Sequence, residues 1–255
     1  MKTDYILTIA GNDVLSGGGM QADLATFTAH SLYGFVAQTC LTAVTEEGFE
    51  IIPVATDIFQ KQLDSLAQVP FVAIKVGLLP NEAIAQSVLD FLKERPHIPV
   101  VLDPVLVFKE NADQEVARMG EFMRQLFPLA TVITPNLKEA QLLSQLSLID
   151  TASMEAAAVK LQSIGAHHVV IKGGARLTED EALDVLVTED GSVEHLCAPL
   201  LKRNNQGAGC TFASAIASGL ARGLSVVEAT RAAKDFVYQA IAFSNDYGVT
   251  QYEKN

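Results

Sequence analysis

The stretch "NNQGAGCT", residues 204–211, places three small residues directly before a cysteine, where an apolar helical pattern begins. A helix N-terminus carries unpaired backbone N–H groups and about half a positive charge, so a glycine turn at that point can bind an anion. The motif GxxxxGK[ST] is absent, and Phe212 stands where GxGxxG requires its third glycine. The turn Gly207-Ala208-Gly209 is therefore either an anion-binding turn or a loop that needs positive φ.

Cys210 lies where this turn becomes the helix. At a helix N-terminus the pKa of a thiol is expected to fall below its usual value of about 8.5, which would let Cys210 act as a base or a nucleophile. A buried cysteine can equally serve as a small apolar packing residue. The sequence leaves both interpretations open.

Two more patterns bring polar groups to the ends of apolar runs. In "TPNLKEA", Asn136 and Glu139 lie three residues apart on one face of a short helix, which suits an N-cap or a site for Mg²⁺ and phosphate. In "VIKGG", Lys172 ends an apolar run beside flexible backbone, which suits a phosphate or a solvated turn. A second glycine-rich turn, "GNDVLSGGGMQAD", carries Asp13 and Asp23 on either side.

The elements that must position these groups alternate along the chain. Strand-like apolar runs are expected at 5–11, 35–43, 50–55, 71–77, 100–105, 130–136 and 167–174. Helical patterns are expected at 19–32, 57–67, 81–95, 154–165, 211–223 and 225–244, with a hairpin around residues 189–191. This order predicts one α/β domain over residues 1–255, a three-layer α/β/α fold with a mainly parallel central sheet. Ligands of such sheets lie beyond the carboxyl ends of the strands.

Composition sets the class of protein. The chain has 255 residues, 49% of them hydrophobic and 19% charged, which is typical of a soluble enzyme with a large core. A formal net charge of -12 argues against nucleic acid and anionic membranes as partners. The three cysteines show no CxxC pair, which favours reduced thiols and a cytoplasmic setting. No apolar run approaches the length of a membrane span, and the N-terminal run is expected to be a strand.

Taken in order, "TIAGND…SGGGMQADLATF", "DPVLV", "TPNLKEA", "VIKGG" and "GAGCTFASAI" resemble the ribokinase superfamily. More narrowly, the series is similar to the branch that holds hydroxymethylpyrimidine (phosphate) kinases and pyridoxal kinases, from about residue 5 to about residue 243. The resemblance implies a ribokinase-like α/β domain, commonly a homodimer. It also implies transfer of the γ-phosphoryl group of ATP to a primary hydroxyl, with Mg²⁺ as the metal.

The resemblance also implies roles for single residues. Gly207, Ala208 and Gly209 would form the anion hole, and Cys210 would stand where ribokinases have an aspartate base. The residues implied at the nucleotide are Asn136, Lys172, Gly173, Gly174, Ala175, Arg176, Asp184, Gly209 and Lys234. Glu139 and Asp103 would lie at the metal. The residues implied at the acceptor are Asp13, Asp23, Val44, Gly77, Val105 and Val107.

Departures from the family pattern bear on the acceptor. Pyrimidine kinases of this branch read "TAQNT", whereas this chain reads "TAVTEEG", with Val44 in place of the glutamine that bonds the pyrimidine. Losing that amide leaves a polar atom of the ligand unpaired, which favours pyridoxal or pyridoxine over hydroxymethylpyrimidine. Phe108 stands where some pyridoxal kinases carry a second cysteine, so a two-cysteine adduct is not expected. A non-catalytic binding protein on this fold is disfavoured because the turn and the Lys–Asn–Glu set are intact.

Overall fold

The structure is a computed structural model that describes residues 3–106, 113–174 and 180–251. Three of the residues implied at the site, Val107, Ala175 and Arg176, lie outside the described residues, and so does Phe108.

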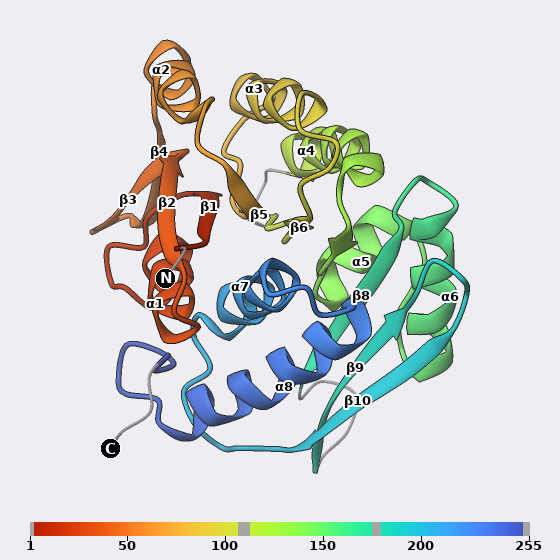
Figure 1. Cartoon of the computed structure of the whole chain (residues 1–255). Helices are drawn as coiled ribbons and strands as arrows, with labels where there is room; N and C mark the ends of the chain where they lie inside the picture. The colour runs from red at the N-terminus through yellow and green to blue at the C-terminus, as the bar shows by residue number, and fades with distance from the viewer. Residues whose placement is uncertain (1–2, 107–112, 175–179, 252–255) are drawn as a thin grey trace.

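An eight-stranded sheet forms the middle layer, in the order β10-β9-β8-β7-β6-β5-β1-β2 (Figure 1). The parallel strands are β1 (Tyr5–Ala10), β2 (Tyr33–Gln38), β5 (Phe71–Val76), β6 (Val100–Leu102), β7 (Val132–Ile133) and β8 (His168–Gly174). The antiparallel strands β9 (Glu181–Val187) and β10 (Val193–Pro199) continue the sheet beyond β8. A separate antiparallel pair, β3 (Cys40–Thr45) and β4 (Gly48–Pro53), projects from one end.

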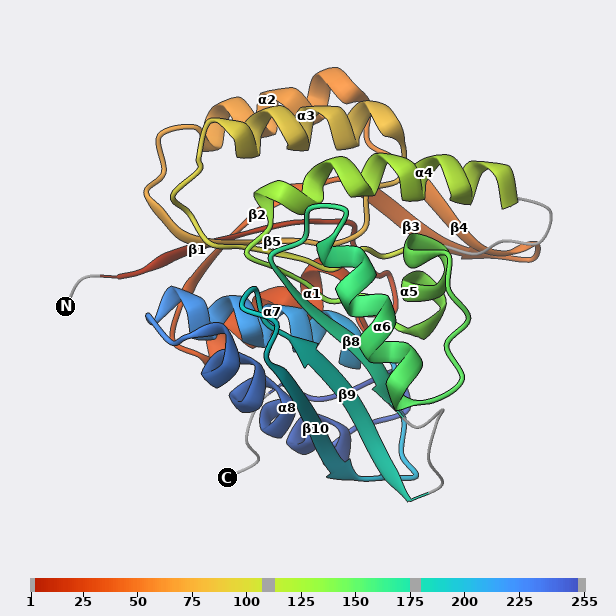
Figure 2. The ribbon, with the colours of Figure 1, turned by 90° about the vertical axis from the view of Figure 1, so that its right-hand side faces the viewer.

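Helices cover both faces of this sheet (Figure 2). One face carries α1 (Gly19–Ala29), α7 (Ala208–Ala221) and α8 (Val226–Ala242). The other face carries α2 (Thr56–Leu66), α3 (Glu82–Lys93), α4 (Asp113–Leu126), a 3₁₀ turn (Phe127–Leu129), α5 (Leu137–Ser144) and α6 (Thr151–Gln162). The predicted three-layer α/β/α class with a mainly parallel sheet is confirmed.

The apolar strand runs explain why both faces are covered. In β8, Val169 and Ile171 pack into the core under α2–α6, whereas Val170 packs into the core with α1, α7 and α8. Successive side chains of a strand point to opposite faces, so a run that is apolar at every position must be buried on both.

Three details differ from the sequence prediction. The apolar run 35–43 is two strands, because the chain leaves the central sheet at the buried residue Thr39 and enters the separate β3–β4 pair. The strand expected over 130–136 contains only two residues, β7. No helix was predicted over α4, whose Gly120 lowers helix propensity.

In the part of the chain that the structure describes, no helix has the length and low polarity needed to cross a bilayer.

Candidate functional site

The first turn of α7 lies directly against the glycine turn before α1. Gly207 caps α7 with φ at 83°, in the left-handed region that favours glycine. A Cβ on Gly207 would lie 1.5 Å from the carbonyl oxygen of Gly17, so no other residue fits. The unpaired N–H groups at the start of α7 therefore lie beside the turn that opens α1.

Cys210 sits in this contact, half-buried, and all three cysteines of the chain are free. Burial raises the pKa of its thiol to about 11. The Lys75 ammonium and a hydrogen bond from the Gly19 backbone act in the other direction, but the carboxylates of Asp103 and Asp23 add to the rise. The prediction of a lowered pKa is wrong, because tertiary burial and two carboxylates outweigh the helix N-terminus. Cys210 is a neutral thiol at neutral pH.

Lys172, at the end of β8, brings a positive charge to the same place. Its ammonium lies 2.6 Å from Oδ1 of Asp103, which also accepts a hydrogen bond from the Thr134 hydroxyl at 3.2 Å. Burial alone would lower the pKa of Lys172, but Asp103 and Glu139 raise it, so the lysine stays charged. A Cβ on Gly209 would lie 3.4 Å from the lysine nitrogen, so this charge reaches the first turn of α7.

Asn136 and Glu139 form a reciprocal capping box at the start of α5. The Asn136 side chain accepts a hydrogen bond from the Glu139 N–H at 3.1 Å, and Glu139 Oε2 accepts one from the Asn136 N–H at 2.8 Å. Glu139 Oε1 also accepts from the Leu106 N–H at 3.4 Å. Burial raises the pKa of Glu139 to about 7, with Lys172 opposing the rise and Asp103 adding to it. Glu139 therefore caps α5 and at the same time lies close enough to the Asp103 carboxylate to be affected by its charge.

Asn136 and Lys172 border a cavity of about 560 Å³ between β8–β10, the start of α7 and α8, whereas Gly207, Cys210, Asp103 and Glu139 are not among its lining residues. Eight residues expected at the nucleotide or the anion hole line it: Asn136, Lys172, Gly173, Gly174, Asp184, Ala208, Gly209 and Lys234. Apolar side chains of Phe212, Val237 and Ile241 complete one wall. A pocket with apolar walls and a few convergent polar groups is the usual form of a small-molecule site.

Asp184 and Lys234 form a closed ion pair in the wall of this cavity. The Lys234 ammonium lies 2.7 Å from Asp184 Oδ2 and also donates to the Ala182 carbonyl at 2.9 Å. Asp184 Oδ1 accepts from the Gly174 N–H at 3.3 Å. The pair therefore fixes β9 to α8, and its charges largely compensate each other.

Asp13 shapes the turn before α1. Its Oδ1 accepts from the Leu15 N–H at 3.0 Å and its Oδ2 from the Gly18 N–H at 2.8 Å. The β3–β4 pair is tied to this turn, because the Val14 N–H donates to the Thr42 hydroxyl at 3.0 Å.

Val44 lies on β3 of that pair and is 59% exposed. Gly77 follows β5. A Cβ on Gly77 would meet the Lys75 ammonium at 2.7 Å, so the glycine leaves room for that group. Val105 follows β6 and is half-buried. Gly77 and Val105 follow strands of the central sheet and so share its carboxyl edge with the cavity, whereas Val44 belongs to the separate pair.

Asp23 does not reach the surface of the site. It is fully buried, and its oxygens accept hydrogen bonds from Thr8 and Ser214, each at 2.6 Å, and from Lys75 at 2.9 Å. The expectation of direct contact with an acceptor is corrected, because Asp23 is fully enclosed and its carboxylate is bonded to the Thr8, Ser214 and Lys75 side chains beneath the turns. Lys75 is not among the residues that the sequence pattern predicts for the site. A lysine inside the apolar run "FVAIKVG" was the available signal, since lysine is rarely buried unless paired.

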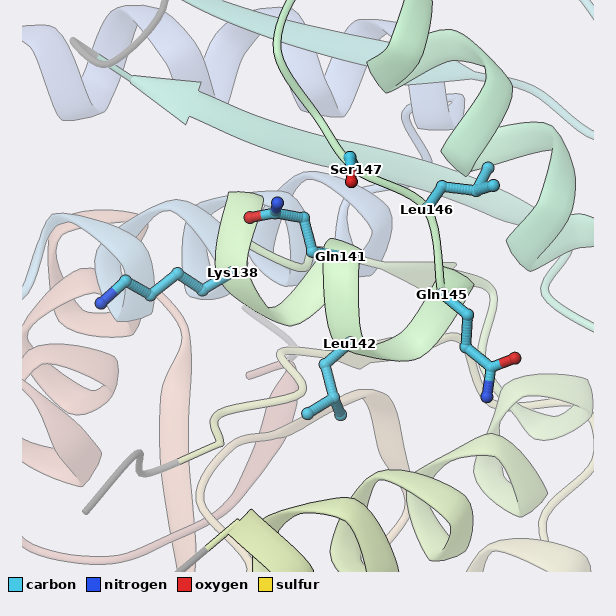
Figure 3. Close-up of a pocket in the computed structure, with 6 residues that line it drawn as sticks. All are labelled: Lys138, Gln141, Leu142, Gln145, Leu146 and Ser147. Atoms are coloured by element: carbon cyan, nitrogen blue, oxygen red, sulfur yellow. The ribbon is translucent and has the colours of Figure 1, made fainter. Parts of the chain in front are cut away.

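A second hollow, of about 470 Å³, lies against α5 and the segment after it (Figure 3). Its six lining residues come from α5 and the segment after it and include none of the candidate site residues. The cavity at α7 is therefore the candidate active site.

Residues 13–254 match the family described as phosphomethylpyrimidine kinase. The chain is 37% identical over 252 residues to the hydroxymethylpyrimidine/phosphomethylpyrimidine kinase of Haemophilus influenzae, covering 95% of this chain and 93% of the relative.

The solved structures that resemble this chain are also kinases. The pyridoxal kinase of Staphylococcus aureus in complex with AMP-PCP superposes with a TM-score of 0.92 at 36% identity, covering 98% of this chain and 94% of the other. The same protein in complex with pyridoxal gives a TM-score of 0.91. The phosphomethylpyrimidine kinase of Clostridium difficile gives 0.75 at 29% identity, covering 94% of this chain and 100% of the other. The predicted membership of a small-molecule kinase family is confirmed.

Proposed function

The chain belongs to the phosphomethylpyrimidine kinase family, and we propose that it transfers the γ-phosphoryl group of ATP to the primary hydroxyl of pyridoxal or pyridoxine. The observation that carries the choice of acceptor is the structural likeness to a pyridoxal kinase, 0.92 in TM-score against 0.75 for a phosphomethylpyrimidine kinase. Sequence identity does not separate the two activities, at 36% and 37%.

The donor nucleotide would occupy the cavity of about 560 Å³. The relative that is solved with AMP-PCP, an analogue of ATP, supports a nucleotide in this family. In this chain the N–H groups at the start of α7 and the Lys172 ammonium supply positive field at one end of the cavity. An acidic protein with a net charge of -12 needs such a local field to hold triphosphate. Phosphoryl transfer depends mainly on alignment and charge stabilisation of this kind.

Asp103 and Glu139 would hold Mg²⁺. Among the described residues no group of three or more His, Cys, Asp or Glu side chains is arranged to hold a metal ion. Mg²⁺ fits here nonetheless, because it takes one or two carboxylates and completes its shell with water and phosphate oxygens. Burial, together with the nearby Asp103 carboxylate, raises the pKa of Glu139 to about 7, so a cation held between the two carboxylates would favour their ionised form. Mg²⁺ would neutralise charge on the transferring phosphoryl group.

The acceptor would lie between the Asp13 turn and the β3–β4 pair. Asp13 holds this turn through two backbone N–H groups, and Val44 offers an apolar surface in place of an amide. Cys210, at the contact of the two turns, would face the attacking hydroxyl as a neutral thiol. In the transfer the hydroxyl oxygen forms the new bond to the γ-phosphorus, the bond to ADP breaks, and the hydroxyl proton leaves to solvent.

The second candidate is a hydroxymethylpyrimidine (phosphate) kinase. It is favoured by the family match over residues 13–254 and by the relative from Haemophilus influenzae. Both candidates use the same donor side and differ only in the acceptor.

A substrate panel tests the proposal. Initial rates with Mg-ATP are measured with pyridoxal, pyridoxine, hydroxymethylpyrimidine and its phosphate, with ADP formation as the readout. The expected result is the highest kcat/KM on pyridoxal or pyridoxine. A higher kcat/KM on either pyrimidine would assign the second candidate, and no turnover on any of them would indicate a non-catalytic binding protein.

A further inference from the structure

A buried charged cluster joins four elements beneath the two glycine turns. It consists of Thr8 on β1, Asp23 on α1, Lys75 on β5 and Ser214 on α7, and all four are fully buried. Asp23 is at the centre, since it accepts hydrogen bonds from the other three. A buried ion pair is rarely favoured over apolar packing for stability alone. The placement of this cluster therefore calls for a reason other than stability.

The two helices face each other in matched register. Gly19 and Asp23 lie four residues apart on α1, and Cys210 and Ser214 lie four residues apart on α7. The Gly19 backbone hydrogen-bonds to Cys210, and one helical turn further the Ser214 hydroxyl donates to Asp23 Oδ1 at 2.6 Å. Residues four apart lie on the same face of a helix, so these two contacts fix both the separation and the rotation of α7 relative to α1.

Lys75, on β5, holds the Asp23 carboxylate from the side of the sheet. Its ammonium lies 2.9 Å from Asp23 Oδ2, the oxygen that Ser214 does not use. Gly77 leaves the space that the ammonium occupies. The lysine thus holds one oxygen of Asp23 while the other remains directed at α7.

We infer that Asp23, held by Lys75, is a positioning residue for phosphoryl transfer: through Ser214 it keeps the start of α7 in register with the start of α1. The inference rests on the proposed function, because α7 would present the phosphoryl group and the α1 turn would present the acceptor. In-line transfer tolerates little misplacement of these two groups, so a loss of register lowers kcat more than it changes KM.

The chain offers matched controls. Ser214→Ala removes the link between Asp23 and α7. Thr8→Val removes a hydrogen bond of equal length, 2.6 Å, to the same buried carboxylate, but that bond leads to β1. Ser218→Ala, one turn further along α7, removes a bond that stays within the helix, to the Ser214 carbonyl at 2.8 Å. Melting temperatures of the three variants report the purely structural cost.

Ser214→Ala is expected to lower kcat about 10-fold or more with KM for both substrates within about 3-fold, whereas Thr8→Val and Ser218→Ala keep kcat within about 3-fold. The inference is overturned if Ser214→Ala and Thr8→Val lower kcat equally at comparable melting temperatures.

A second readout needs no turnover. The alkylation rate of Cys210 by iodoacetamide, followed by mass spectrometry of its peptide, is expected to rise about 3-fold or more in Ser214→Ala and not in Thr8→Val, because the start of α7 is released. Absence of turnover by the unaltered protein would refute the proposed function. Equal alkylation rates in the two variants would refute the positioning role.

Discussion

The Lys172 ammonium lies 2.6 Å from the Asp103 carboxylate and borders the first turn of α7. One lysine therefore connects the carboxylates at the proposed metal site to the N–H groups that would receive the phosphoryl group. The side chain is only 15% exposed, so its charge is weakly screened by solvent.

Lys172→Met should lower kcat by about 10²-fold or more, because it removes positive charge from the place where negative charge develops. Steady-state rates with Mg-ATP measure this loss. Lys61→Met is a suitable control, since that lysine makes an exposed ion pair with Asp57 on α2 and does not line the cavity. Retention of more than a tenth of kcat in Lys172→Met would contradict the assignment.

Cys210→Ser should retain kcat within about 3-fold of the unaltered protein, whereas Cys210→Ala should lose about 10-fold, because it removes a neutral hydrogen bond worth about 1 kcal/mol. The reason is the raised pKa of about 11, which makes the side chain a neutral hydrogen-bonding group at neutral pH. The two variants are compared at pH 7.5 in the same assay. Equal losses in both would instead indicate that a thiolate is required.

The pH dependence of Cys210 alkylation follows from the same pKa. Only the thiolate reacts, so the rate should increase about tenfold per pH unit from pH 7 to 10 and level off near the pKa of about 11. Exposed Cys197 provides an internal comparison within the same sample, because its peptide is separate. A plateau of the Cys210 rate below pH 9 would contradict the raised pKa.

Val44→Gln should shift substrate preference towards hydroxymethylpyrimidine, because an amide on β3 can pair with the polar atoms of the pyrimidine. The measured quantity is the ratio of kcat/KM on pyridoxal to kcat/KM on the pyrimidine. Val44→Leu serves as a control that enlarges the side chain without adding an amide. An unchanged ratio in Val44→Gln would remove Val44 from the specificity argument.

Gly207→Ala should unfold the chain or lower its melting temperature strongly, because the new Cβ would overlap the Gly17 carbonyl oxygen. Gly191→Ala is the matched control. Gly191 has the same φ of 83°, but a Cβ there would meet nothing within 4 Å, so only backbone strain of about 1–3 kcal/mol remains. Thermal unfolding of both variants separates the contact from the strain, and equal shifts would exclude a steric role for the contact.

The cavity could be predicted from the sequence because its polar residues follow apolar runs. Lys172 and Asn136 were placed at strand ends by local pattern alone, and both line the cavity. The carboxyl ends of neighbouring parallel strands meet at one edge, so local pattern was sufficient there.

Long-range contacts could not be predicted. Asp23 and Ser214 are 191 residues apart in sequence, and no local pattern indicates that they bond. The pKa of Cys210 was misjudged for the same reason, since the rule for helix N-termini takes no account of the burial of the thiol or of Asp103, which only the folded chain brings near.

The contact between Gly17 and Gly207 joins the turn before α1 to the start of α7, two segments that are far apart in the sequence. A Cβ on Gly17 would also lie 2.6 Å from the carbonyl oxygen of Tyr247, in the segment after α8. During synthesis on the ribosome the turn before α1 must therefore wait until α7 and the segment after α8 have been made before its contacts can form. Nascent chains that stop before α7 would contain every strand of the sheet yet lack this contact, and the proposed active site would form only after the sheet.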